Sequence, residues 1–232
     1  MKKDNFSGRR KFLGTLTVSA AAMGIAGIIT PFQQTHAASA TMLDNAGSDL
    51  DEWFKKIKGK HRIVFDATRP HEVFPFAWPR VFLMTNEITG TLAKDCSVVV
   101  VLRHDAIPYA LQHDLWAKYN LGEVFKAEDP ATKKPSTRNP FWKPAKGEYK
   151  VPGIGEVAIG INELQESGVM FCVCDAAMTV YSAGLAEAMK LNAAEVKKEW
   201  VAGLLPGIQP VPSGVWALGR AQENGCSYCF AG

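Results

Sequence analysis

Cys174 stands where an apolar run gives way to a helical pattern, and a cysteine in that position can be reactive. The run Val169–Cys174 predicts a buried strand, and Ala176–Leu191 predicts the helix that follows it. A thiol at a helix start meets unpaired backbone N–H groups and a partial positive charge, and both favour the thiolate. The thiolate is the nucleophilic form of cysteine, so we expect Cys174 to be the catalytic or carrier residue.

Arg103 and His104 follow the strongest strand signal in the chain. The run Ser97–Leu102 is continuously apolar after its first residue, which is typical of a strand buried on both faces. The carboxyl ends of parallel strands share one edge of a sheet, where α/β proteins bind their ligands. We therefore expect Arg103 and His104 beside Cys174, where they can stabilise a thiolate or bind an oxyanion. The alternative is a helix cap, provided by Asp105, next to solvated charges.

Three further side chains are weaker candidates for chemistry. Asp66 ends the first predicted strand and should reach the same edge as Arg103. His71 and His113 can in principle bind a metal, but no tight spacing of histidine, cysteine and carboxylate residues accompanies them. We therefore predict no metal site and no cofactor.

The segments around these residues resemble a known family. They are Val173–Met178 with the central Cys174, Pro212–Val215, and Leu218–Gly225. Together they resemble the DsrE/DsrF-like sulfur-relay superfamily, over roughly Arg62–Gly232 apart from an insertion. The resemblance implies a small flavodoxin-like α/β fold, a homo-oligomer, and a persulfide carried on Cys174.

The same resemblance extends the expected site. Asp175 belongs to the first segment, and Ser213 and Gly214 belong to the second, so these three join Arg103 and His104 as expected substrate-binding residues. The implied activity is transfer of a sulfane sulfur between thiols, as a carrier or as a sulfurtransferase-like enzyme, with a sulfur donor or acceptor protein as partner. The superfamily's relay members are mostly cytosolic and lack so long an insertion.

Two other classes of function stay open. In the first, the protein is a non-catalytic module that binds a small anion or a partner, and the thiol is incidental. In the second, it is a redox or metal-binding protein that uses Cys172, Cys174 and a histidine. Cys172 lies two residues before Cys174, on the same face of the strand and deeper in the sheet, where packing explains a cysteine equally well.

The first 40 residues read as an export signal. Arg9 and Arg10 precede an uncharged stretch, residues 13–32, and small residues at 37–40 suit a signal peptidase. Paired arginines before a mild apolar stretch resemble a twin-arginine signal, which implies the twin-arginine export machinery as a partner and a periplasmic or otherwise exported protein. The alternative is a permanent membrane anchor, because the stretch is just long enough to span a bilayer. We expect a mature chain that starts at Ala38 or Thr41 and does not span the membrane.

The charge balance depends on this segment. The chain of 232 residues carries a formal charge of +3, but its first 40 residues hold five basic side chains and one acidic one. The remainder is therefore close to neutral, which argues against a dedicated nucleic-acid binder. A composition with 47% hydrophobic and 21% charged residues predicts a globular protein, and we expect one domain over residues 41–232.

Export would permit disulfides among the five cysteines, of which at least one must stay unpaired. Cys226 and Cys229 form a C-x-x-C pair without the following helix that a thioredoxin site needs. On a strand the two would lie about 10 Å apart on opposite faces, too far for a mutual disulfide.

The remaining elements alternate between strands and helices. This alternation predicts an α/β fold, with a mostly parallel sheet of about five strands and helices on both faces. The exception is Glu123–Val151, an irregular insertion whose apolar Asn139–Trp142 should dock on the body or on a neighbouring subunit. The predicted strands are Arg62–Asp66, Ser97–Leu102, Val169–Cys174, Ile208–Pro212 and Cys226–Ala231. The predicted helices are Trp78–Ile88, Ala106–Tyr119, Val157–Gln165, Ala176–Leu191, Ala193–Leu204 and Val215–Glu223.

Overall fold

Five parallel strands form the central sheet of the computed structural model, which describes residues 49–232. In space their order is β6-β5-β2-β1-β7, and each neighbouring pair runs parallel. Their bounds are β1 His61–Ala67, β2 Cys96–Leu102, β5 Met170–Cys174, β6 Ile208–Val211 and β7 Ser227–Phe230. The proposed export signal lies outside the described residues. Residues 49–53 are helical and belong to a unit of their own, whereas the sheet belongs to the unit Phe54–Gly232.

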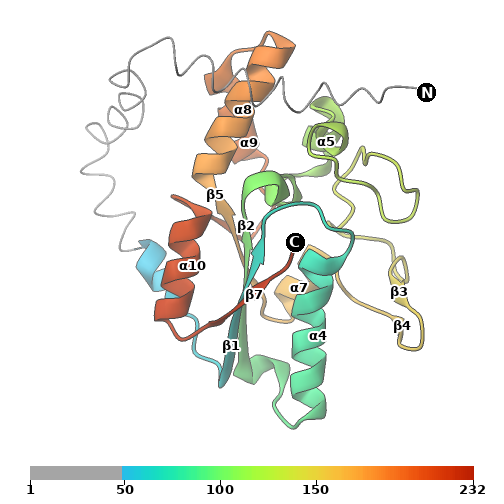
Figure 1. Ribbon diagram of the computed structural model, residues 1–232, viewed down its shortest axis with the longest axis vertical. Coiled ribbons are helices and arrows are strands. Elements are labelled where there is room, and N and C mark those ends of the chain that lie inside the picture. Colours follow the sequence, from blue (N-terminus) through green and yellow to red (C-terminus); the bar gives the residue numbers. More distant parts are fainter. Residues whose placement is uncertain (1–48) are drawn as a thin grey trace, which may run out of the picture. The chain divides into compact units, whose positions relative to one another are not determined.

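Helices cover both faces of the sheet, which confirms the predicted α/β class. Figure 1 shows α10 on one side of the sheet and α4 and α7 on the other, while α8 and α9 pack against each other beyond β5. The bounds are α4 Phe74–Ile88, α7 Ile161–Glu166, α8 Asp175–Met189, α9 Ala193–Ala202 and α10 Gly214–Glu223. This architecture is consistent with a flavodoxin-like fold. Within residues 49–232, no helix combines the length and the apolar character needed to cross a bilayer.

Shorter elements fill the connections. They are the 3-10 helices η2 Ala93–Asp95 and η3 His104–Ala110, the helices α5 His113–Lys118 and α6 Leu121–Val124, and a hairpin of β3 Lys150–Val151 and β4 Gly155–Glu156. The hairpin pairs the last two residues of the insertion with the segment that follows it, and the sequence did not predict it.

The register of the sheet brings the ends of its strands together. Ala67 pairs with Leu102, and Leu102 pairs with Val173 on the next strand. Cys174 is aligned with Val211, the last residue of β6. The residues that follow these strands therefore meet at one edge, as the crevice rule for parallel sheets requires.

The two faces of the sheet are packed differently. The face under α4 carries an aromatic core, in which the ring of Phe76 lies 4.2 Å from Phe141 and 5.2 Å from Tyr109 between centroids. The opposite face carries smaller buried side chains, Val64, Val99, Val101 and Cys172, and the buried residues of α10 above it include Ala217 and Ala221. Because side chains alternate along a strand, Cys172 and Cys174 both lie on this α10 face.

The insertion packs on the chain's own body. Phe141 is fully buried in the aromatic core. Asn139 is also fully buried, and its amide donates to the carbonyls of Tyr109 (2.8 Å) and Leu111 (2.9 Å). The apolar stretch thus docks as its composition indicates, while most of the insertion stays irregular.

Two of the predicted helices are wrong at their boundaries. The expected helix over Ala106–Tyr119 is divided between η3 and α5, because Pro108 lacks an N–H donor and residues 111–112 are extended. The expected helix over Val157–Gln165 begins only at Ile161, where Glu163 Oε2 accepts from the backbone N–H of Gly160 (2.8 Å) and caps the start.

A third helix, α4, starts four residues earlier than the predicted Trp78. Proline is tolerated in the first turn of a helix, where its missing N–H would be unpaired, so Pro75 does not prevent this start.

Candidate functional site

Cys174 is the last residue of β5 and also the N-cap of α8. Its Sγ accepts a hydrogen bond from the backbone N–H of Ala177 at 3.3 Å. The side chain is only 7% exposed. A sulfur that accepts an amide at a helix start is placed to hold negative charge, as the sequence pattern predicts.

Arg103 is held at the same edge by Asp66, through two parallel hydrogen bonds. Its Nε lies 2.6 Å from Asp66 Oδ1, and its Nη2 lies 2.8 Å from Oδ2. Asp66 is 1% exposed, and Tyr228 also donates its hydroxyl to Oδ2 at 2.9 Å. A buried carboxylate with both oxygens bonded fixes the plane of the guanidinium.

The positive charge of Arg103 interacts with the thiol of Cys174. The pKa of Arg103 is raised, chiefly by the hydrogen bond to Asp66, and partial burial opposes this rise. Negative charge on Asp66, Tyr228 or Cys174 raises the pKa further. Arg103 is therefore within electrostatic range of Cys174, and only two of its five N–H donors are used by Asp66.

Gly214 and Ser213 contribute space and a helix cap. A Cβ on Gly214 would lie 2.6 Å from Cβ and 2.8 Å from Cδ of Arg103, so only glycine fits beside this side chain. Ser213 is the N-cap of α10, where its Oγ accepts from the backbone N–H of Trp216 at 3.2 Å. Gly214, the first residue of α10, thus lies against the arginine, and Ser213 precedes it as the cap.

Asp175 is turned toward a lysine of the neighbouring helix. Its carboxylate forms an ion pair with Lys197 of α9, which also donates to the Asp175 carbonyl (3.1 Å) and to Thr179 Oγ1 (3.0 Å). A carboxylate next to a thiolate is unfavourable, but a paired one repels it less. The structure therefore gives Asp175 a role in joining α8 and α9.

The ion pair of Arg103 and Asp66 does not include His104. Its side chain is 62% exposed, and Nδ1 is 3.3 Å from Asp105 Oδ1. Its ring meets Tyr181, in the second turn of α8, edge-on at 5.8 Å between centroids. Tyr181 in turn donates its hydroxyl to Asp105 at 2.5 Å. His104 has a positive φ of 51°, an uncommon conformation that turns the chain at the end of β2.

All five cysteines are free thiols, and four of them are disfavoured as thiolates. Burial raises the pKa of Cys172, Cys96 and Cys229, and it raises the pKa of Cys226 to about 11. Cys172 is fully buried, and the neighbouring Cys174 raises its pKa further. Thiolate chemistry at these four positions is therefore costly.

The two histidines considered as possible metal ligands take part in packing and hydrogen bonding within the protein. His71 packs against Phe74 at 5.0 Å between ring centroids. His113 Nδ1 accepts from the backbone N–H of Asn139 at 3.2 Å, and its pKa is lowered first by burial and then by the charge of Arg138. In the part of the chain that the structure describes, no group of three or more His, Cys, Asp or Glu side chains is arranged to hold a metal ion.

Sequence reasoning missed two partners in the site. Tyr228 reaches Asp66 because β7 lies beside β1, although 162 residues separate the two in the chain. Lys197 reaches Asp175 because α9 folds back on α8. Neither residue has a local sequence signal, since both contacts depend on which elements become neighbours in space.

Comparisons with known proteins add little to this description. No protein-family model and no curated protein matches the chain. Among solved structures, the chain is similar to a protein of unknown function from Methanobacterium thermoautotrophicum, MTH1491, with 18% sequence identity and a TM-score of 0.34. The match covers 74% of this chain and 99% of that one.

Proposed function

We propose that the protein carries sulfane sulfur as a persulfide on Cys174. One observation carries the proposal: a thiol that accepts a helix N-terminal amide lies within electrostatic range of an arginine fixed by a buried carboxylate. Both features stabilise negative charge on sulfur. The resemblance of this segment to the DsrE/DsrF-like superfamily supports the same chemistry.

The transfer step needs no outside oxidant. The Cys174 thiolate attacks the outer sulfur of a donor persulfide, R–S–SH, and a new S–S bond forms as the old one breaks. The donor leaves as the thiolate R–S⁻, and Cys174 becomes Cys–S–SH. An acceptor thiolate then removes the outer sulfur by the same exchange, which regenerates Cys174. The protein acts in this scheme as a carrier between a donor and an acceptor protein.

The surrounding residues have separate roles in the proposal. Arg103 stabilises the thiolate and the anionic persulfide with the N–H donors that Asp66 leaves unused. Gly214 keeps space for the arginine side chain, and Ser213 orders the start of α10. His104 and Asp175 border the region and do not touch the transferred sulfur.

A non-catalytic binding module is the second candidate. The low exposure of Cys174 favours it, because a buried sulfur is harder for a donor protein to reach. In that case Arg103 would bind a small anion, and the cysteine would be incidental.

We also propose that the protein is exported and that it forms a homo-oligomer. The paired Arg9 and Arg10 and the apolar stretch after them support export through the twin-arginine route to the periplasm. The superfamily resemblance supports a homo-oligomer.

The proposal is tested by incubating the reduced protein with inorganic polysulfide and locating the added sulfur by mass spectrometry. We expect one added sulfur atom on Cys174, and no stable addition in Cys174→Ala. Cys172 and Cys174 share the tryptic peptide 151–190, so fragment ions must separate the two.

Cys229→Ala is the matched control, because Cys229 is more exposed than Cys174 and lies on an edge strand. This variant should load like the wild type. Loading that persists in Cys174→Ala but is lost in Cys229→Ala would reject the proposal in favour of the binding module.

A further inference from the structure

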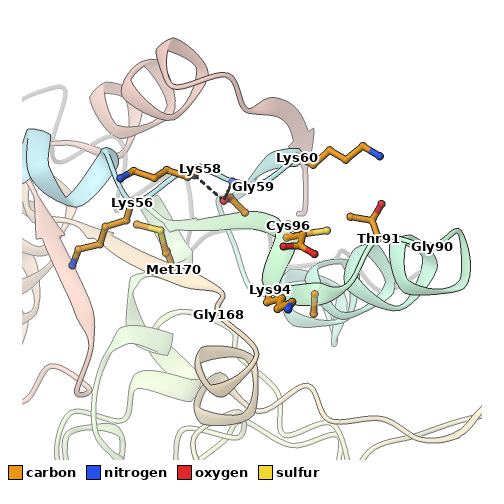
Figure 2. Close-up of a pocket in the computed structure, with 13 residues that line it drawn as sticks. Lys56, Lys58, Gly59, Lys60, Gly90, Thr91, Lys94, Cys96, Gly168 and Met170 are labelled. Carbon is orange, nitrogen blue, oxygen red and sulfur yellow. Dashed lines mark hydrogen bonds between the residues drawn. The ribbon is translucent and has the colours of Figure 1, made fainter.

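A cavity of about 620 Å³ opens at the amino edge of the sheet, where β2 and β5 begin. Its wall comes from the loop before β1, from the turn before β2, and from Gly168 and Met170 (Figure 2). Strands of five and seven residues span about 17 to 23 Å, so this cavity is remote from Cys174 at the opposite edge. It is a separate feature of the molecule.

The lining of the cavity is strongly basic. It contains Lys56, Lys58, Lys60 and Lys94, against the single acidic side chain of Asp95. Within residues 49–232, none of these four lysines forms an ion pair, whereas Lys118 and Lys197 elsewhere do. Three unbalanced positive charges around one hollow attract anions.

The loop that bears three of the lysines is held rigidly. The backbone N–H groups of Lys58 and Gly59 donate to Ser97 Oγ at 3.1 and 2.8 Å. The N–H of Lys60 donates to the Asp95 carbonyl at 2.6 Å. A Cβ on Gly59 would lie 2.4 Å from the Cys96 carbonyl carbon, so the loop lies directly against the start of β2. Such a loop loses little freedom when a ligand binds.

The cavity also contains a neutral hydrogen-bond donor, the hydroxyl of Thr91. Thr91 is 7% exposed and lines the cavity, yet its hydroxyl makes no hydrogen bond to any residue in the described range. The hydroxyl oxygen is reached by solvent, unlike the fully buried and unpartnered Nε1 of Trp200, so it is open to a ligand in the cavity. An oxygen atom of a bound anion would accept its hydrogen bond.

We propose that this cavity binds a small molecule that carries two or more phosphate groups. Lysine ammonium groups bind phosphate as point charges. Figure 2 shows Lys56 and Lys58 reaching to one side of the cavity and Lys60 to the other, with Lys94 between them. Charges that are spread in this way suit several linked anionic groups better than one. Thr91 adds a neutral donor at the wall.

The test is isothermal titration of the full chain, at low ionic strength, with tripolyphosphate, pyrophosphate and sulfate. We expect saturable binding of one tripolyphosphate per chain, with weaker pyrophosphate and weakest sulfate. Lys58→Gln combined with Lys94→Gln should weaken tripolyphosphate at least tenfold, and Thr91→Val should weaken it at least threefold. Lys146→Gln combined with Lys198→Gln removes the same charge from exposed lysines that form no ion pair within residues 49–232, and it should leave the affinity within twofold.

Three results would overturn the proposal. They are the absence of saturable binding, sulfate binding as tight as tripolyphosphate, and equal weakening by the control pair, which would indicate a nonspecific charge effect. Thermal melting of each variant shows whether it is folded. If the double lysine variant does not fold, the conservative Thr91→Val variant still provides the test. None of these variants touches Cys174, so the sulfur-carrier proposal is tested independently.

Discussion

Arg103 and Asp66 form a bidentate ion pair that joins the end of the central strand β2 to the end of its neighbour β1. The two hydrogen bonds measure 2.6 and 2.8 Å, and the carboxylate is almost completely buried. Asp66 therefore orients Arg103, and Arg103 places its charge near Cys174. The chemistry proposed for Cys174 therefore depends on Asp66, which acts on the thiol through Arg103.

Asp66→Asn should destabilise the protein by about 2 kcal/mol, because it leaves a partly buried guanidinium without its counter-charge. The effect is smaller than for a fully buried pair, since the Arg103 side chain is 27% exposed. Urea unfolding measures it, and Glu166→Gln, at an exposed carboxylate, is the control that should change little. An Asp66→Asn variant as stable as the wild type would remove the structural role assigned to the pair.

Two glycines of α10 give a matched pair of substitutions. Gly214→Ala should cost about 1 to 3 kcal/mol, because its Cβ collides with the Arg103 side chain. Gly219→Ala meets no atom within 4 Å and should stabilise the helix by about 0.5 to 1 kcal/mol. Thermal melting of both variants is the measurement. Similar shifts for the two would show that Gly214 does not lie against the arginine.

The buried thiol of Cys226 should make the free energy of unfolding depend on pH in the alkaline range. Burial raises the pKa of its thiol from about 9 to about 11, an effect that the charge of Arg62 partly opposes. Between these values the unfolded chain loses the proton while the folded chain keeps it, so stability falls as the pH rises, by up to about 3 kcal/mol.

Cys226→Ala should lose less stability than the wild type between about pH 8 and about pH 11. Urea unfolding at both pH values measures the difference, and any constant cost of the substitution cancels. Parallel pH profiles of the two proteins would be inconsistent with a buried thiol at this position.

The strands could be predicted from the sequence because their signal is local. Continuous runs rich in valine, such as Ser97–Leu102, are typical of buried parallel strands, and β2 matches this run within one residue. The helix boundaries were harder to predict from the sequence. Pro108, which lacks an N–H donor, and the extended residues 111–112 divide one expected helix.

The candidate site could be predicted only in part. The junction at Cys174 follows from local pattern, and the edge that carries Arg103 follows from the rule for parallel sheets. Sequence alone did not show that Arg103 pairs with Asp66, or that Tyr228 joins them from the last strand. These contacts require the strand order, which places β7 beside β1 and is set by the packing of the whole sheet.

The export proposal predicts the N-terminus of the mature protein. In its native host, N-terminal sequencing should find a chain that begins at Ala38 or Thr41. Changing Arg9 and Arg10 together to lysine should stop export, as judged by the periplasmic fraction. A membrane-bound protein that retains Met1 would be incompatible with a cleaved signal.

The most direct test of the central claim is competition among the five cysteines for a limiting amount of iodoacetamide, read by peptide mass spectrometry on the reduced, folded protein. Cys174 should be alkylated first, because burial raises the pKa of the other four thiols while a helix amide and Arg103 support negative charge on this one. Arg103→Gln should slow Cys174 several-fold and leave Cys229 unchanged. If Cys229 or Cys226 reacts before Cys174 in the wild type, the sulfur-carrier account is contradicted.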